Sequence, residues 1–233
     1  SVPTPEIVWW ALLPVIVLAV SGVLLLTISS LLKKEISWLA PGISLTAGIF
    51  VLLSSIPMWN RIQNDGPISF LNNSVGTDSS TIFLTSLIAI ALISTSILAR
   101  PYLSREGIPD LEFYVLLLLS AAGGVVMAGA NDLIVLFLGI EILSIAVYVL
   151  VALHLRKIES QEAAIKYFLL GAFSSAFLLY GIALVYGAVG TTNLIGIRNF
   201  LVNSLLIEDG MLMIGFALML VGLGFKVAVF PFH

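Results

Sequence analysis

The sequence predicts an all-α integral membrane protein, a polytopic bundle of about seven transmembrane helices. Of its 233 residues, 60% are hydrophobic and only 10% are charged, and the mean hydropathy is +1.14. Soluble domains carry about 25% charged residues, so a chain this apolar must be solvated largely by lipid. The apolar residues fall into seven runs, each close to the roughly 20 residues that a helix needs to cross the hydrocarbon core.

The first three runs predict membrane-spanning helices at residues 5–32, 37–58 and 81–99. Pro14 lies inside the first run and is a candidate kink. A polar stretch rich in Asn, Ser and Gly, residues 60–80, predicts an exposed loop, and residues 100–110 predict a short charged loop. The N-terminus lacks the basic segment of a secretory signal, so the first run is expected to be a retained span. Residues 1–110 would thus form an N-terminal group of three helices.

Four later runs predict helices at residues 112–130, 133–153, 160–189 and 210–231. Asn131 and Asp132 would join the first two of these as a tight antiparallel hairpin, with Asp132 starting its helix because a carboxylate favours the N-terminal end of the helix dipole. Between the last two runs, residues 191–209 place apolar side chains at helical spacing and predict a short interfacial helix. Residues 111–233 would thus form a second group of four helices.

The predicted loops differ in their basic residues, which indicates an orientation. Counted over alternate loops, one side carries six basic residues, namely Lys33, Lys34, Arg100, Arg105, Arg156 and Lys157. The other side carries two, Arg61 and Arg198. Because cytoplasmic loops hold the excess of Lys and Arg, we expect the N-terminus on the outer side. The two remaining basic residues, Lys166 and Lys226, lie within predicted spans.

The composition also limits the chemistry of the chain. It contains no cysteine, which excludes disulfides, iron–sulfur clusters and thiolate metal sites within this chain. Its two histidines are His154, expected in an interfacial loop, and His233, so a histidine-ligated haem or zinc site is not expected. No basic stretch resembles a nucleic-acid-binding surface. Redox groups that serve this protein would therefore lie in partner subunits.

A single glutamate, Glu141, lies near the middle of the fifth predicted span, nine residues after Asp132 and twelve before Leu153. An ionised side chain there costs about 2.5 to 3.5 kcal/mol on insertion scales, so it must face protein or water. Ser144 and Tyr148 follow three and seven residues later and form a polar stripe on the same helix face. Glu141 is either a structural carboxylate bonded to hydroxyls of a neighbouring helix or a protonatable group in an ion path, which is the default for intramembrane carboxylates.

Lys226 lies in the seventh predicted span, which offers no acidic partner of its own. Gly215, Gly222 and Gly224 would let another helix approach this span closely. Pro231 removes a backbone donor and is expected to break the helix near the lysine. Interrupted helices at membrane depth commonly border polar cavities, which favours a functional lysine; the alternative is a side chain that extends to the cytoplasmic edge.

Lys166 is the third candidate for proton transfer, six residues into the sixth predicted span. Glu162, four residues earlier, could pair with it on the helix surface, and its side chain could extend to the interface. In contrast to such a surface role for Lys166, Gly171, Ser174 and Ser175 continue a small polar face deeper along the same helix. Such a face would suit a hydrated route that leads onward from the lysine.

The fourth to seventh predicted spans carry a recognisable series of motifs. In order they are EFY at 112–114, GANDL at 129–133, LGIE at 138–141, YVL at 148–150, EAAIKYFLLGAFSS at 162–175, GFK at 224–226 and PFH at 231–233. This series resembles the N-type membrane subunits of respiratory complex I, the NADH–quinone oxidoreductase. The resemblance covers roughly residues 100–233 through specific motifs; before that it depends on hydropathy and topology alone.

The resemblance implies an antiporter-like fold, with inverted repeats of five helices that each contain a broken helix and a central lysine. Glu141 matches the family's fifth-helix glutamate. Lys226 matches the central lysine of the first repeat, which lies on a broken seventh helix. Lys166 matches the lysine of a motif that is typical of this subunit. Family members continue for about as many residues again beyond the motif at 231–233. The chain is therefore expected to hold at most half of a complete proton pathway.

The resemblance also implies a non-redox, proton-pumping subunit of a translocase, driven by quinone reduction elsewhere. Flavin, iron–sulfur clusters and quinone would belong to partner subunits, with no cofactor in this chain. The partners would be other membrane subunits of an obligate hetero-oligomer in an energy-transducing membrane, such as the bacterial inner membrane.

The physical basis of this assignment is an acid and an amine that control each other's ionisation. Burial in a low dielectric disfavours the charged form of an amine, and a nearby carboxylate favours it. At roughly 6 Å and an effective dielectric near 20, the attraction is about 3 kcal/mol. Movement of Glu141 relative to Lys226 could therefore make the lysine hold or release a proton, with Glu141 as modulator and Lys226 as carrier.

Two other functions are compatible with the sequence. A subunit of a Mrp-type cation/proton antiporter or of a membrane-bound hydrogenase would share the fold and the Glu–Lys pair, although Lys166 and its Ser174–Ser175 motif favour complex I. A purely structural membrane scaffold would use its buried charges for helix registry.

Overall fold

The computed structural model describes residues 6–31, 38–203 and 210–229. The described helices are α1 (Trp9–Leu31), α2 (Leu39–Asp65), α3 (Ser79–Glu106), α4 (Asp110–Ala128), α5 (Leu133–Ala152), α6 (Ile158–Val189), α7 (Leu194–Asn203) and α8 (Gly210–Lys226). Six of them, α1 to α6, are long and apolar enough to cross a membrane, and α8 is a shorter apolar helix of 17 residues. The prediction of an all-α polytopic membrane protein is confirmed.

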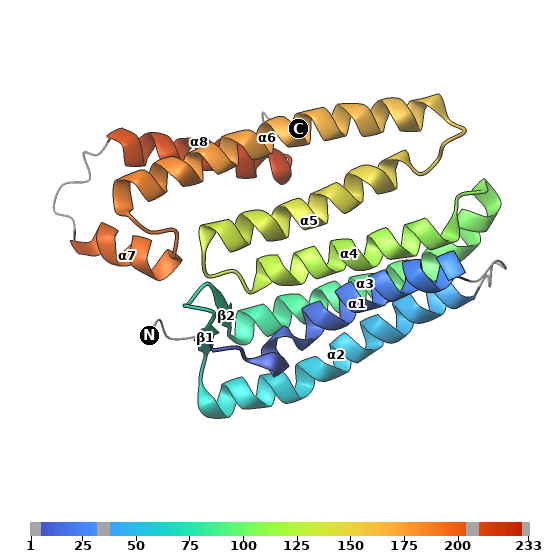
Figure 1. The fold of residues 1–233 in the computed structure, drawn as a ribbon, viewed down its shortest axis with the longest axis horizontal. Helices are drawn as coiled ribbons and strands as arrows, with labels where there is room; N and C mark the ends of the chain where they lie inside the picture. Colours follow the sequence, from blue (N-terminus) through green and yellow to red (C-terminus); the bar gives the residue numbers. More distant parts are fainter. Residues whose placement is uncertain (1–5, 32–37, 204–209, 230–233) are drawn as a thin grey trace.

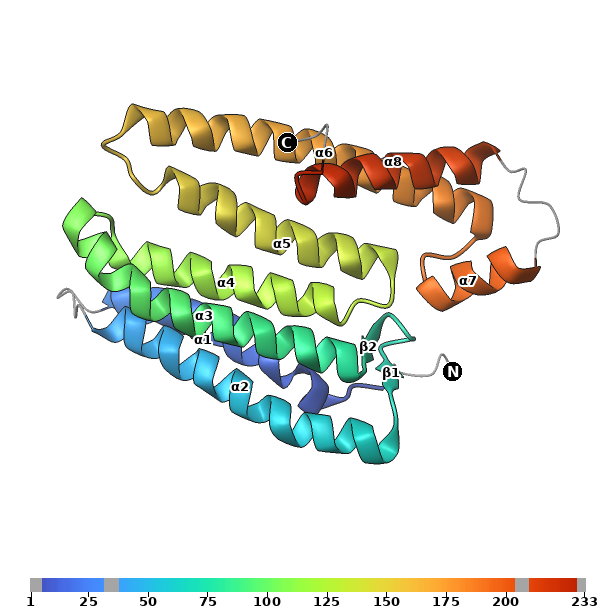
Figure 2. The ribbon, with the colours of Figure 1, turned by 180° about the vertical axis from the view of Figure 1, so that it is seen from behind.

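The long helices run side by side, each antiparallel to the next in the chain (Figure 1). Helices α1 to α4 pack around one core, in which Leu18, Leu25, Val51, Tyr114 and Leu118 are almost fully buried. Figures 1 and 2 show α5 between this group and the pair formed by α6 and α8. Helix α5 therefore presents one face to α4 and another to the α6–α8 pair.

Two predicted loops are wrong in part. In the polar stretch 60–80, α2 continues to Asp65, and the strands β1 (Ile68–Phe70) and β2 (Val75–Thr77) form an antiparallel hairpin. In the charged stretch 100–110, α3 continues to Glu106 with Pro101 inside the helix, and Gly107 ends it in the left-handed conformation, at φ 65°. Both helices extend beyond their apolar runs because helical geometry satisfies the backbone in a polar interface as well as in lipid.

The β-hairpin is tied to the two turns beside it by asparagine side chains. The Asn131 Nδ2 donates to the carbonyl of Asn73 at 2.8 Å, and the Asn193 Nδ2 donates to the same carbonyl at 2.7 Å. Asp132 caps α5 by accepting from the Ile134 amide, as predicted, and also accepts from the Thr192 hydroxyl. The hairpin, the α4–α5 turn and the α6–α7 turn therefore form one polar cluster at this end of the bundle.

Helices α6 and α8 are in contact along a seam of glycines. A Cβ at Gly222 would lie 2.9 Å from both the Leu178 nitrogen and the Ser174 carbonyl oxygen. A Cβ at Gly215 would lie 3.1 Å from the Gly181 carbonyl oxygen. The expectation that another helix approaches Gly215 and Gly222 closely is confirmed, and that helix is α6.

Helix α8 ends at Lys226, before the proline that was expected to break it. Ala228 has a φ of 50°, and the Val229 amide donates to the Gly224 carbonyl across this turn. A left-handed residue followed by such a bond is the Schellman termination of a helix. Pro231 and His233 lie outside the described residues, as does Leu205, one of the apolar residues of the predicted interfacial helix. That helix is observed as α7.

Candidate functional site

The site is built on one face of α5. Glu141 lies near the middle of this helix, and Ser144 and Tyr148 follow at three and seven residues, a spacing that stacks side chains on one helix face. Ser144 and Tyr148 are buried, whereas the Glu141 side chain is 21% exposed in this chain. The polar stripe predicted from the sequence therefore exists, and it faces the α6–α8 pair.

Lys226, the last residue of α8, extends its ammonium group to this stripe. Its Nζ lies 3.2 Å from the Glu141 Oε1, 3.1 Å from the Ser144 Oγ and 3.1 Å from the Tyr148 hydroxyl. A lysine ammonium has three N–H donors, so the three oxygens match its donors in number. Because the Lys226 side chain is only 12% exposed, this set of bonds compensates a charge that is largely removed from solvent.

Helix α6 completes the site through Ser175, while the adjacent Ser174 bonds to α8 outside it. The Ser175 hydroxyl lies 2.5 Å from the Glu141 Oε1 and 2.9 Å from the Gly171 carbonyl oxygen. The Ser174 hydroxyl donates instead to the Gly222 carbonyl of α8 at 2.8 Å. Ser175 therefore binds α6 to the carboxylate on α5, whereas Ser174 binds α6 to α8.

Aromatic rings and a glycine hold Tyr148 in place. Its ring packs edge-to-face on those of Tyr167 and Phe168 from α6, at centroid distances of 4.8 and 5.8 Å. Its hydroxyl lies directly against Gly171, where a Cβ would clash with it. The Lys226 Nζ lies 5.6 Å from the ring centroid of Tyr148, on the side of its hydroxyl group, so the hydroxyl and not the ring face makes the contact.

Of the three residues predicted to transfer protons, the structure brings together Glu141 and Lys226. Lys166 lies apart from them on an exposed face of α6, where it pairs with Glu162 one turn earlier. Its side chain is 68% exposed in this chain. The surface ion pair considered for Lys166 from the sequence is thus the arrangement observed.

The contact between Ser175 and Glu141 does not follow from the sequence, although both residues lie on polar helix faces. Helical spacing reveals which residues share a face of one helix, but it contains no information on which faces of two helices meet. Ser175 was recognisable only as part of the small polar face that begins at Gly171.

A second polar cluster lies at the opposite end of the bundle from the β-hairpin. Glu106 at the end of α3 pairs with Lys157 at 3.1 Å, and the His154 Nε2 lies 3.6 Å from the same Oε2. His154 is thus in the loop between α5 and α6, as predicted, and its side chain is 15% exposed. This cluster joins α3 to the α5–α6 loop and shares no residue with the site around Lys226.

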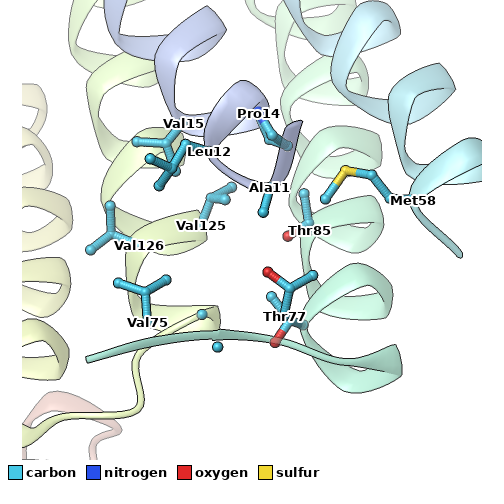
Figure 3. A pocket seen from close by; sticks show the side chains of 13 residues that line it. Ala11, Leu12, Pro14, Val15, Met58, Val75, Thr77, Thr85, Val125 and Val126 are labelled. Carbon is cyan, nitrogen blue, oxygen red and sulfur yellow. The ribbon is translucent and has the colours of Figure 1, made fainter. Parts of the chain in front are cut away.

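A small cavity lies between α1, α4 and the hairpin, with a volume of about 70 Å³ (Figure 3). Apolar side chains line most of it, including Leu12, Val15 and Val125, with Thr77 and Thr85 as polar members. It contains none of the residues that surround Lys226. Within the described part of the chain, no group of three or more His, Asp or Glu side chains is placed to bind a metal ion.

Comparison with known proteins places this fold in a family. Residues 130–233 match the family model described as NADH:quinone oxidoreductase/Mrp antiporter, transmembrane. The NADH-quinone oxidoreductase subunit N 2 of Koribacter versatilis is 36% identical over 235 aligned residues, which cover 98% of this chain and 47% of that protein. The chain thus spans about half the length of the curated relatives it matches.

Solved structures support the same assignment. A chain of respiratory complex I from Thermus thermophilus superposes with a TM-score of 0.75 at 31% identity, over 94% of this chain and 45% of that one. A chain of the Mrp complex from Dietzia sp. shares the fold, with a TM-score of 0.76 at 19% identity over 97% of this chain and 42% of that one. By sequence and by fold, the chain is similar to the NADH:quinone oxidoreductase/Mrp antiporter transmembrane family, and within it to subunit N of NADH-quinone oxidoreductase.

Proposed function

We propose that this chain is the first antiporter-like part of a proton-translocating membrane subunit of NADH–quinone oxidoreductase. In this proposal Lys226 carries the proton and Glu141 controls whether it is held. The observation that supports it most directly is the bonding of the Lys226 ammonium to Glu141, Ser144 and Tyr148, which lie on a different helix from the lysine.

The mechanism depends on the strength of the Glu141–Lys226 attraction. Two unit charges 3.2 Å apart attract each other by about 5 kcal/mol at an effective dielectric near 20. While the carboxylate is close, it stabilises the ammonium; when the two helices separate the charges, or when Glu141 takes up a proton, the ammonium loses that stabilisation and can release its proton. A displacement of a few ångströms between α5 and α8 would therefore be enough to change the occupancy of the lysine.

The energy for such a displacement would come from quinone reduction in other subunits. The chain has no cysteine to bind an iron–sulfur cluster, so the proposal assigns flavin, iron–sulfur clusters and quinone to partners. The protein would function as an obligate hetero-oligomer with other membrane subunits of the complex, and Lys166 on its exposed face would contribute to a proton route only after a partner or a further segment covers it.

We further propose that the protein resides in a bacterial inner membrane with its N-terminus on the outer side. The support is the distribution of basic residues. The end of the bundle that contains Arg105, Arg156 and Lys157 would face the cytoplasm, and the end with the β-hairpin would face outward.

The proposal is tested by proton pumping in the intact complex reconstituted into liposomes. Lys226→Ala and Glu141→Ala should each lower the ratio of protons pumped to electrons transferred, whereas Glu141→Asp should have a milder effect because it retains the charge. Glu159→Ala, at an exposed glutamate in the first turn of α6, is the matched control and should pump at the parental ratio. Parental ratios in both alanine variants would refute the assignment.

The same experiment separates transport from a purely structural role. In a scaffold, replacement of Glu141 by Gln or of Lys226 by Met would reduce the amount of assembled complex, while each complex that did assemble would pump normally. In the proposed carrier, complexes that assemble with these neutral residues pump fewer protons per electron.

A second candidate is a subunit of a Mrp-type cation/proton antiporter, because the matching family model and the fold comparison both include such proteins. Identification of the subunits that co-purify with the full-length protein decides between the two. Flavin- and iron–sulfur-containing partners support the oxidoreductase, and their absence from an active transporter supports the antiporter.

A further inference from the structure

Ser175 has one hydroxyl proton and two acceptors within hydrogen-bonding distance. One is the Glu141 Oε1 on α5, at 2.5 Å, and the other is the Gly171 carbonyl one turn earlier on α6, at 2.9 Å. A serine hydroxyl can donate only one hydrogen bond but can accept two. The Ser175 hydroxyl can therefore donate its proton to only one of these two oxygens at a time.

The charge of Glu141 determines which oxygen accepts the hydrogen bond from Ser175. An ionised carboxylate can only accept, so the Ser175 hydroxyl then donates to it in a charge-assisted bond. A protonated carboxyl can donate its own hydrogen to the Ser175 oxygen, and the serine then turns its proton to the Gly171 carbonyl, the bond that helical serines commonly make to the carbonyl four residues earlier. Both arrangements leave the Ser175 hydroxyl and the Glu141 Oε1 hydrogen-bonded to each other.

We propose that Ser175 is a positioning residue that holds the Glu141 side chain beside Lys226 in both charge states of the carboxyl group. The inference rests on the proposed function, because it concerns the carboxylate assigned there as modulator. When Glu141 becomes neutral, most of its attraction to Lys226 disappears, and the bond to Ser175 keeps the carboxyl in place for the return of the proton. Ser175 thus performs a task that the ion pair alone cannot.

The adjacent Ser174 makes the role of Ser175 testable. Both serines are buried on α6, at 3% and 8% exposure, and both donate hydrogen bonds to other helices. Ser174 donates to a backbone carbonyl of α8, which has no charge to lose, whereas Ser175 contacts an ionisable group. A general loosening of α6 would affect both alanine variants alike, but a role in positioning Glu141 would affect only the variant at Ser175.

The experiment is infrared difference spectroscopy of the intact complex in membranes over a pH titration. The carbonyl stretch of protonated Glu141 is identified as the band that disappears in Glu141→Gln. The other titratable groups that the structure places at the site are Lys226 from α8, Tyr148 from α5 and Tyr167 from α6, whose ring packs on that of Tyr148. The carbonyl stretch distinguishes the glutamate from all three.

In Ser175→Ala the midpoint of the Glu141 band should move to higher pH by about one unit, a tenfold effect, because a hydrogen bond stabilises a charged acceptor more than a neutral one. The band should also shift in frequency, since the neutral carboxyl loses its partner. Ser175→Thr retains the hydroxyl and should restore the parental midpoint, and Ser174→Ala should leave it unchanged. If Ser175→Ala does not assemble, Ser175→Cys, which has a similar size and is a much weaker donor, should show the same shift.

The possible outcomes distinguish this inference from the proposed function. If the Glu141 band titrates in the parent and has the same midpoint and frequency in Ser175→Ala or Ser175→Cys, the positioning role is wrong and the carrier proposal stands. An equal shift in Ser174→Ala also overturns the positioning role. If no Glu141 band titrates in the parent, Glu141 does not change its charge and the positioning role in two charge states is wrong; the proposed function is then decided by the pumping ratios of Glu141→Ala and Lys226→Ala.

Discussion

The three oxygens around Lys226 differ in what they can do. Glu141 supplies a negative charge, whereas Ser144 and Tyr148 supply hydroxyls that can either accept or donate. When the lysine is charged, all three accept from its ammonium. When it is neutral, one hydroxyl can turn and donate to the free lone pair of the amine. The site can therefore form hydrogen bonds with both the charged and the neutral form of Lys226. Three carboxylates around the lysine could not, because they have no hydrogen to donate to the neutral amine and would leave an excess of negative charge.

Tyr148→Phe tests this property, because it removes one oxygen while it preserves the ring that packs on α6. Hydrogen bonds to charged groups contribute about 1.5 to 3 kcal/mol, so the variant should slow proton pumping by roughly tenfold or more. The measurement is the initial rate of proton uptake by the reconstituted complex. Tyr167→Phe is the control, since the ring of Tyr167 contacts Tyr148 but its hydroxyl is not one of the three oxygens around Lys226. Equal rates in both variants and the parent would show that the hydroxyl is not needed.

At the scale of single residues, the sequence was sufficient wherever one helix determined the geometry. The positions of Glu141, Ser144 and Tyr148 on one face follow from 3.6 residues per turn. Their contact with Lys226 across helices was supported by the need of a buried charge for a partner. The bond from Ser175 to Glu141 could not be predicted in the same way, because it depends on the rotation of α6 about its own axis, which is set by packing.

At the scale of elements, helix α8 is held in register by its contact with α6. Gly222 lies one turn before Lys226 and meets the backbone of α6 without room for a side chain. The helix then ends at the lysine, where the negative end of the helix dipole favours a positive charge by about 0.3 to 1 kcal/mol. The seam and the helix end together fix where the ammonium can reach.

Gly222→Ala should therefore disturb the site without altering any of its polar groups. The added Cβ would lie 2.7 to 2.9 Å from Leu178 and Ser174, mostly from backbone atoms, so α8 must move away from α6. We expect a loss of about 1 to 3 kcal/mol in stability and a reduced pumping rate. Gly210→Ala is the matched control on the same helix, because a Cβ there meets nothing within 4 Å. The two variants are compared by thermal unfolding of the purified complex and by its pumping rate. Equal unfolding temperatures and equal rates would show that the close contact of Gly222 with α6 does not position the site.

The errors in the predicted elements have physical causes. The stretch 60–80 is polar, but its strands are stabilised by partners distant in the sequence: Val75 bridges to Ala130, and the Gly76 amide donates to the Gly129 carbonyl. No local pattern predicts such pairing. The end of α3 is a different case, because Gly107 is a typical helix-terminating residue and could have placed the boundary.

At the scale of the whole molecule, the two ends of the bundle are stabilised by different chemistry. The end with the hairpin is joined by the neutral asparagine side chains of Asn131 and Asn193, together with one carboxylate, Asp132. The opposite end is joined by Glu106 and its contacts with Lys157 and His154, which are charged or can be. A positive-inside orientation would place this charged cluster in the cytoplasm, and the site around Lys226 lies between the two ends.

The absence of cysteine from the sequence allows this orientation to be measured directly. Gln63→Cys introduces one thiol at the exposed end of α2 beside the hairpin, and Arg156→Cys introduces one in the exposed α5–α6 loop. A membrane-impermeant maleimide added to intact cells with a permeable outer wall should label the first variant and not the second; after permeabilisation both should react. The two sites lie at opposite ends of an antiparallel bundle, so they must give opposite results in any spanning orientation. If only Arg156→Cys is labelled in intact cells, the orientation is the reverse of the one proposed, and the hairpin faces the cytoplasm. If both variants are labelled in intact cells, the bundle does not span the membrane.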